Sequence, residues 1–310
     1  MNQKLIETHD LTKIYNLKGR RNALVALDNI NINIQEDEIF GLLGPNGAGK
    51  TTFVQLLTTL KQPTSGSATI NGYDILKKPK KARENIALML DSKMLYYRIT
   101  GYANLKFFCK IYKVPYSKER VTSLAEELGI KKWLDQYVEY YSGGMMMKLA
   151  LIRTLLLNRR ILFLDEPTLG LDVESKSLII QKLKVIKENH SILFTSHDMD
   201  AVEKLCDRIA FINKGKIIKI GSKEDIKKIH KHKVHLVVSV KESSKTIISE
   251  LNSLDYVLES KINKGHILIV LKNRDFYSSL LNELIKYDIR KINEIEDTLE
   301  DAFLKLNANY

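Results

Sequence analysis

The chain has 310 residues, of which 44% are hydrophobic and 28% are charged, a composition typical of a folded globular protein and not of a disordered chain. No apolar run approaches the ~18 residues that a membrane-spanning helix needs. Only Cys109 and Cys206 occur, far apart in the sequence, so we expect neither a disulfide framework nor a cysteine metal site. This cysteine content favours a reducing, cytosolic setting.

The net charge of the chain is +12, and the basic surplus is uneven. Residues 222–310 carry 15 basic and 14 acidic side chains, which leaves +11 for residues 1–221. A polyphosphate ligand, nucleic acid or an anionic membrane surface would suit this surplus. A lysine-rich surface that only faces solvent would explain it equally well.

Residues 1–221 alternate between short apolar runs and helical patterns. The runs are nearly all apolar, which is typical of central strands of a parallel sheet that are buried on both faces. The predicted strands are 38–43, 161–164 and 191–196, and the predicted helices are 50–60, 148–157 and 173–188. This order indicates βαβ units and an α/β fold.

Two further regions depart from that alternation. Residues from about 92 to 155 are rich in aromatic side chains and lysine at helical spacing, which predicts a helical subdomain inserted into the α/β core. Residues 222–310 mix both patterns and predict a small C-terminal α+β domain. Its expected helices are 223–233, 247–254, 276–287 and 299–306, and its expected strands are 234–240 and 267–271.

A glycine-rich loop follows the first predicted strand and precedes a predicted helix. It fits the P-loop pattern of Gly, four residues, then Gly-Lys-Thr. Its glycines let backbone N–H groups approach phosphates, Lys50 would bridge the β- and γ-phosphates, and the Thr51 hydroxyl would bind Mg²⁺. A plain glycine-rich turn is the alternative. The candidate nucleotide-binding residues are Gly44, Pro45, Asn46, Gly47, Ala48, Gly49, Lys50, Thr51 and Thr52.

Two acidic residues follow the predicted strand 161–164. A carboxylate at this end of a buried parallel strand faces the ligand crevice of an α/β sheet. Asp165 would hold Mg²⁺ through water, and Glu166 would polarise the attacking water as general base. Taken alone, such a pair is a common turn or helix cap, but the P-loop upstream favours the catalytic interpretation.

Three more elements, in a fixed order, resemble a known family. Ser142-Gly143-Gly144 opens a predicted helix, Asp165 lies 23 residues after Ser142, and His197 lies 32 residues after Asp165. Together with the segment 169–172, they make residues 3–221 resemble the nucleotide-binding domain of ABC transporters. The resemblance implies a P-loop NTPase fold, ATP and Mg²⁺ as cofactors, and a homodimer that holds ATP between its two copies.

The same resemblance implies roles for single residues. Tyr15 would stack on adenine, and Ser142, Gly143 and Gly144 would bind the γ-phosphate of ATP held by the other copy. Asp172 would lie at the dimer interface. His197 would contact the γ-phosphate and act in catalysis beside Glu166 and Lys50.

The sequence departs from the family pattern at two positions. Asp91 stands where the family usually has glutamine, between the sheet and the helical subdomain. An aspartate can accept a hydrogen bond from metal-bound water but cannot donate one, so Asp91 is a possible nucleotide- or magnesium-binding residue with altered chemistry. Met145 replaces the usual glutamine of the signature, which changes the polar contacts expected there.

Residues 222–310 resemble the C-terminal extension of ATPase subunits of bacterial drug-resistance and antibiotic-immunity exporters. The resemblance implies an ATPase that works at the inner face of the cell membrane with separate transmembrane permease subunits, and no nucleic-acid partner. The alternative is a soluble ABC ATPase that acts on nucleic acid or ribosomes, which the basic charge favours. The single P-loop and the absence of a heptad array argue against it.

Overall fold

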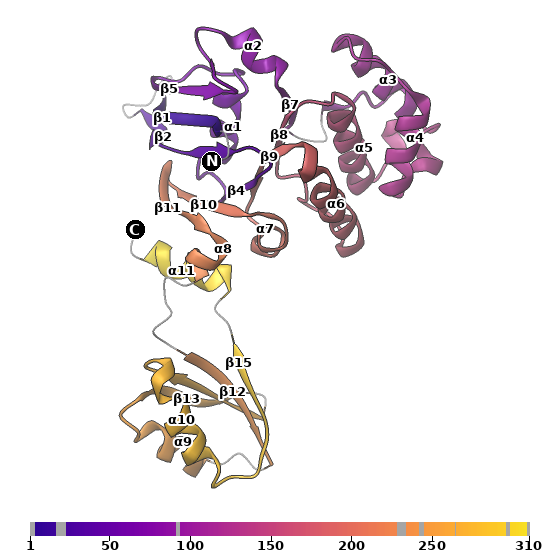
Figure 1. The fold of residues 1–310 in the computed structure, drawn as a ribbon. Helices are drawn as coiled ribbons and strands as arrows, with labels where there is room; N and C mark the ends of the chain where they lie inside the picture. Colours follow the sequence, from indigo (N-terminus) through magenta and orange to yellow (C-terminus); the bar gives the residue numbers. More distant parts are fainter. Residues whose placement is uncertain are drawn as a thin grey trace. The chain divides into compact units, whose positions relative to one another are not determined.

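The computed structural model describes residues 4–16, 23–90, 94–227, 234–241, 245–263, 265–295 and 298–308. The chain divides into two compact units, Met1–Lys223 and Glu224–Tyr310. Figure 1 follows both units in chain order.

A six-stranded sheet forms the centre of the first unit (Figure 1). Five of its strands run parallel, and one antiparallel strand closes an edge. In spatial order they are β11 (Lys216–Ser222), β10 (Arg208–Asn213), β4 (Ile39–Leu43), β9 (Ser191–Ser196), β8 (Ile161–Asp165) and β7 (Ile86–Met89). Every residue of β4, β8 and β9 is buried, which explains why the middle of each strand is apolar.

An antiparallel sheet packs on the same apolar core, and the sequence patterns did not predict it. Helix α1 (Lys50–Leu57) contributes Phe53 to a buried cluster that also contains Ile6 of the antiparallel sheet and Phe40 of the parallel sheet. The helix therefore ties the two sheets together. The antiparallel strands are β1 (Lys4–Tyr15), β2 (Leu24–Ile30), β3 (Asn33–Gln35), β5 (Ser65–Ile70) and β6 (Tyr73–Asp74).

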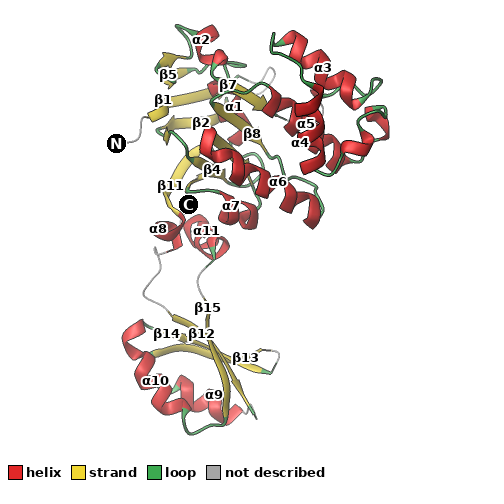
Figure 2. Ribbon diagram, turned by 45° about the vertical axis from the view of Figure 1, so that its right-hand side comes forward, coloured by secondary structure: helices red, strands yellow, loops and turns green. Residues whose placement is uncertain are grey.

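The segment between β7 and β8 is mainly helical (Figure 2). Its longer helices each begin at a hydroxyl residue, Thr100, Ser117 or Ser142, whose oxygen accepts a backbone N–H three residues further on. These helices are α3 (Gly101–Ile111), α4 (Lys118–Glu127) and α5 (Gly143–Leu156), with 3-10 turns at Lys131–Trp133 and Val138–Tyr140. Helix α2 (Pro79–Glu84) precedes β7.

Helices α6 (Val173–Ile186) and α7 (Met199–Leu205) follow β8 and β9, and a 3-10 turn at Lys187–Asn189 extends α6. The predicted end of α1 was wrong. Helix α1 ends at Leu57 and not at residue 60, because Thr59 takes a left-handed φ of 59° that a helix cannot continue. Helix α5 begins at Gly143, directly after its Ser142 cap, as expected from a Ser142-Gly143-Gly144 segment that opens the helix continuing into 148–157.

The second unit has a four-stranded antiparallel sheet in the order β13-β14-β12-β15. Its β-α-β-β-α-β chain order and this strand order make it a ferredoxin-like arrangement. Apolar residues alternate along β12, and they pack with α9 and α10 in one buried cluster. The elements are α8 (Lys223–Lys227), β12 (Val234–Val240), α9 (Lys245–Asn252), β13 (Val257–Asn263), β14 (His266–Leu271), a 3-10 turn (Arg274–Phe276), α10 (Tyr277–Leu284), β15 (Ile289–Ile295) and α11 (Leu299–Ala308).

The α/β fold and the small α+β region predicted from the sequence are thus both confirmed. Among the helices that the structure describes, none has the length and apolar character required to cross a membrane.

Candidate active site

The glycine-rich loop joins the end of β4 to the start of α1, as predicted. Gly49 has a φ of 112°, and a Cβ there would lie 2.6 Å from the Ala26 carbonyl oxygen. A Cβ on Gly44 would lie 2.1 Å from the Ile212 carbonyl oxygen. Both positions therefore need glycine. Helix α1 has Gly49 as its N-cap residue and no side-chain cap, so its first N–H groups can bind an anion.

A cavity of about 520 Å³ lies beside this loop, a size typical of small-molecule sites. Loop residues 45–52 form one wall, and Tyr15 of β1 and Glu166 contribute to the others. The remaining lining residues are Leu24, Val25, Ala26 and Lys214. The structure therefore brings the predicted adenine-stacking tyrosine, the phosphate loop and the predicted general base to one cavity.

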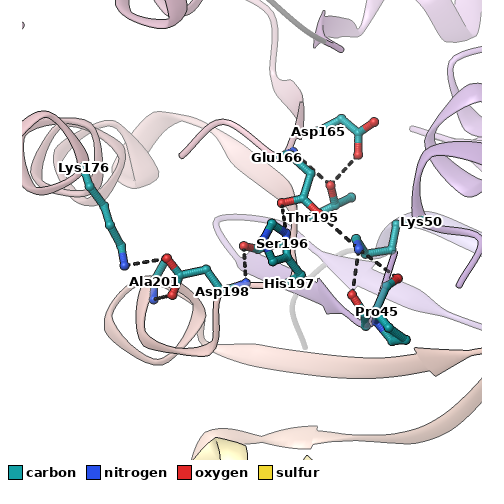
Figure 3. A network of polar contacts seen from close by, with 11 residues as sticks. Pro45, Lys50, Asp165, Glu166, Lys176, Thr195, Ser196, His197, Asp198 and Ala201 are labelled. Atoms are coloured by element: carbon teal, nitrogen blue, oxygen red, sulfur yellow. Dashed lines mark hydrogen bonds and ion pairs between the residues drawn. The ribbon is translucent and has the colours of Figure 1, made fainter. Parts of the chain in front are cut away.

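Lys50 is almost fully buried within its own loop. Its Nζ donates to the Gly44 carbonyl at 2.7 Å and to the Pro45 carbonyl at 3.3 Å, and it lies 3.1 Å from Glu166 Oε1 (Figure 3). The amine thus stands between the phosphate loop and the acidic residue after β8. A phosphate at the loop would meet a positive charge already held in place.

Asp165 ends β8 and its side chain is buried. The Thr195 hydroxyl of β9 donates to its Oδ1, and Thr51 of the phosphate loop is a second hydrogen-bond partner. Burial raises the pKa of Asp165 above its usual value, although these two hydrogen bonds act in the opposite direction.

Both the backbone and the carboxylate of Glu166 are held by polar contacts. Its backbone takes a left-handed φ of 51°, a conformation that costs energy for a residue with a Cβ, and its N–H donates to the Thr195 hydroxyl at 3.1 Å. Its Oε1 faces Lys50, and its Oε2 lies 2.9 Å from His197 Nδ1 (Figure 3). The carboxylate therefore links the phosphate loop to the histidine after β9.

His197 and Glu166 also line a second, smaller cleft of about 230 Å³. Glu166 lies on the walls of both cavities, so the predicted general base connects them. Leu169, Leu171 and Val173 form apolar parts of this second cleft.

Tyr15 lies under two lysines. Lys61 Nζ is 3.0 Å from the phenol oxygen and 4.7 Å from the ring centre, and Lys13 Nζ is 5.2 Å from the ring centre. Burial would raise the pKa of Tyr15, but hydrogen bonds with Lys61 and Thr52 and the two positive charges outweigh it, so the pKa is lowered.

Ser142, Gly143 and Gly144 do not line the cavity of about 520 Å³ among the residues that the structure describes there. Ser142 caps α5 by accepting the Met145 N–H at 3.2 Å. Asp172 caps α6 in the same way, accepting the Ser175 N–H at 2.8 Å. Asp91 lies outside the described residues.

Thr195 is a functional residue that the sequence reasoning missed. Its hydroxyl contacts both acidic residues, and the side chain is fully buried. A signal was available, because Thr195 lies two residues before His197 at the end of a predicted strand that adjoins the Asp165 strand. Lys61 beside Tyr15 had no such signal, since it lies 46 residues away in the sequence.

The donor set fits a magnesium ion. Mg²⁺ is usually held by one or two oxygen side chains together with substrate phosphates, and not by a cage of protein ligands. Asp165 and Thr51 supply one carboxylate and one hydroxyl, already in contact and next to the phosphate loop. Elsewhere in the described parts of the chain, no group of three or more His, Cys, Asp or Glu side chains could hold a metal.

Comparison with known proteins identifies the family. Residues 27–169 match the ABC transporter family. The chain is 30% identical to the linearmycin resistance ATP-binding protein LnrL of Bacillus subtilis, over 94% of this chain and 97% of LnrL. The chain therefore belongs to the ATP-binding subunits of ABC transporters, and its activity is ATP hydrolysis coupled to transport.

Particular relatives differ in the function that their names give. The chain is 32% identical to the daunorubicin/doxorubicin resistance ATP-binding protein DrrA of Streptomyces peucetius, over 72% of this chain and 67% of DrrA. It is also 32% identical to the methionine import ATP-binding protein MetN 1 of Bacillus thuringiensis, with the same coverage. The dimeric ATP-binding cassette MJ0796, solved with ADP and Pi, has the same fold, with a TM-score of 0.64 and 23% identity over 70% of this chain and 98% of that one.

Proposed function

We propose that this chain is the ATPase subunit of an exporter of drug-like or antibiotic compounds. The observation that carries this proposal is the extent of the similarity to LnrL, which covers 94% of the chain and so includes most of the C-terminal unit. The matches to DrrA and MetN 1 cover only 72% of the chain. A resistance protein is thus among the relatives that match this chain over nearly its whole length.

We infer that two copies of the chain bind two ATP molecules between them. Ser142 to Gly144 are at the start of a helix, where N–H groups and the helix dipole favour an anion, yet they do not line the phosphate-loop cavity of their own chain. A second copy would bring this helix start to the γ-phosphate. The dimeric MJ0796 cassette, which has the same fold, is consistent with such an arrangement.

The side chains of this site then have distinct tasks in hydrolysis. Lys50 and the loop N–H groups would bind the phosphates, and Thr51 and Asp165 would hold Mg²⁺, which would supply positive charge against the developing negative charge. Phosphate oxygens at Lys50 would replace Glu166 as its partner. Glu166 would keep its contact with His197 and become free to accept a proton from the attacking water.

The membrane subunits would dock on the helical region. An apolar cleft of about 520 Å³ there is lined by Tyr96, Tyr97, Arg98, Ile99 and Phe107. Tyr96 is 52% exposed and packs edge-on against Phe107 at 4.8 Å, so a preformed aromatic surface faces solvent. Such a surface supports a position at the inner face of the cell membrane, and the basic charge suits an anionic lipid surface as well as ATP.

Co-expression with the candidate membrane subunits in a drug-sensitive bacterium tests the proposal. We expect lower susceptibility to linearmycin or daunorubicin with the wild-type chain and no protection with Glu166→Gln, which binds ATP but cannot activate water. Co-purification with the membrane protein is expected in both cases. Unchanged drug susceptibility together with Glu166-dependent methionine uptake would refute export.

A further inference from the structure

Lys176 of α6 forms ion pairs with two aspartates near the candidate active site. Its Nζ lies 2.5 Å from Asp198 Oδ2 (Figure 3). The same Nζ lies 3.1 Å from Asp200 Oδ2. The lysine side chain is only 20% exposed, and the Asp198 side chain is 32% exposed. Lys176 and Asp198 both line the cleft of about 230 Å³ that contains His197 and Glu166.

Asp198, the residue directly after His197, is held from three directions. Its Oδ1 accepts the Ala201 N–H at 3.1 Å and so caps α7, while its own N–H donates to the Ser196 hydroxyl at 2.9 Å. Lys176 takes the second carboxylate oxygen. Ser196 is itself buried at the end of β9. With both of its neighbours held, the backbone that carries His197 has little freedom to turn.

The same lysine belongs to the segment that starts α6. Its backbone N–H bonds to the Asp172 carbonyl at 3.0 Å, and Asp172 caps the helix. The ion pair therefore joins the loop after β8, which contains Glu166, to the loop after β9, which contains His197. Because removing water from two charges offsets much of their attraction, an ion pair as little exposed as this one is weak evidence for a role in stability alone.

We propose that Lys176 is a positioning residue for ATP hydrolysis, which holds His197 against Glu166 by fixing Asp198. The proposal rests on the catalytic roles given above to Glu166 and His197. His197 Nδ1 lies 2.9 Å from Glu166 Oε2, and its side chain is 41% exposed, so few other contacts restrain the ring. Reaction rates depend steeply on such placement, since a misplacement of about 1 Å can cost about a hundredfold in rate.

Steady-state ATPase assays of the full chain test this role through Lys176→Met. We expect kcat to fall about tenfold, with KM and the affinity for a fluorescent ATP analogue within about twofold of wild type. Lys176→Arg, which keeps the charge and the reach to Asp198, should recover most of the lost kcat. If Lys176 only stabilised the fold, Lys176→Met would lower the free energy of unfolding, and kcat would not fall while KM stayed unchanged.

Lys182 offers a matched control on the same helix. It is 13% exposed and lies 2.5 Å from Glu127 Oε2, but it lines neither of the two cavities beside Glu166. Lys182→Met should therefore lose a similar ion pair and keep the wild-type kcat. Equal kcat values for wild type and Lys176→Met, or equal losses in the two lysine variants, would overturn the proposal.

A double-mutant cycle with Asp198→Asn shows whether Lys176 acts through Asp198. We expect the double variant to be no slower than the slower single variant, because both changes remove the same restraint. If the double variant lost kcat by the product of the two single losses, Lys176 would not act through Asp198. If the catalytic role given to Glu166 is wrong, Glu166→Gln will turn over ATP at the wild-type rate. This result differs from the results that would overturn the role of Lys176, so the two failures can be distinguished.

Discussion

Replacing Thr195 by valine removes one hydroxyl from the centre of the site and nearly preserves the side-chain volume. The hydroxyl donates to the Asp165 carboxylate and accepts a hydrogen bond from the Glu166 N–H. In the variant, the Glu166 N–H still has an acceptor, because it also donates to the Thr195 carbonyl at 3.2 Å. The main loss is thus one hydrogen bond to a buried charged group, worth about 1.5–3 kcal/mol. We expect Thr195→Val to lower the free energy of unfolding by that amount at neutral pH.

Thr154→Val is the matched control, because Thr154 is also fully buried but donates to an uncharged acceptor, the Ala150 carbonyl at 2.9 Å. Its loss should be within about 1 kcal/mol. Urea unfolding followed by the fluorescence of Trp133, the single tryptophan, measures both variants in the first unit. Equal stability of Thr195→Val and wild type would refute the energetic role given to this hydroxyl.

The same variant has a pH dependence whose sign follows from the raised pKa of Asp165. A carboxyl whose pKa is raised on folding favours folding in acid, and this contribution is lost as the pH rises through the folded-state pKa. Thr195→Val raises that pKa further, so its deficit in stability should be largest at neutral pH and shrink in acid. Urea unfolding at acid and neutral pH, without Mg²⁺ and ATP, measures this deficit, and a deficit of equal size at both pH values would contradict the reasoning.

Three further substitutions probe the phosphate loop and the predicted signature. Gly44→Ala places a Cβ 2.1 Å from a carbonyl oxygen and should abolish ATP binding at a cost of about 3 kcal/mol, whereas Gly47→Ala, where a Cβ meets nothing within 4 Å, should cost about 1–2 kcal/mol. Calorimetric titration and urea unfolding measure both, and intact ATP binding in Gly44→Ala would contradict the packing argument. Ser142→Ala removes a cap worth about 1 kcal/mol and should abolish turnover while ATP binding to the single chain persists. A parallel loss of ATP binding would place Ser142 in its own chain's cavity.

The central strands were predictable from the sequence, because strands that are buried on both faces have mainly apolar residues. The motifs were predictable because each one is a local pattern of a few residues. Strand β9 has the predicted bounds 191–196, and strand β12 has the predicted bounds 234–240. Strand β1 was not predicted, because apolar and polar residues do not alternate regularly along it. Its burial pattern is irregular, and its pairing with neighbouring strands contains several register shifts.

The contacts that organise the site were harder to predict than its members. The P-loop motif and the acidic pair follow from local patterns, whereas Lys176 and Asp198 lie 22 residues apart and meet only because α6 and α7 pack together. The left-handed backbone of Glu166 is likewise a product of tertiary contacts, since glutamate has no local preference for that conformation. Sequence patterns therefore located the chemistry, and packing determined its geometry.

The size of Glu166→Gln in solution, with and without Mg²⁺ and ATP, tests the central claim most directly. If two copies close around ATP and Glu166 starts its cleavage, this variant should be a stable dimer with Mg²⁺ and ATP and a monomer without nucleotide. The wild-type chain should return to monomer as ATP is consumed. A variant that hydrolyses ATP at the wild-type rate, or that stays monomeric with saturating ATP, would contradict the account.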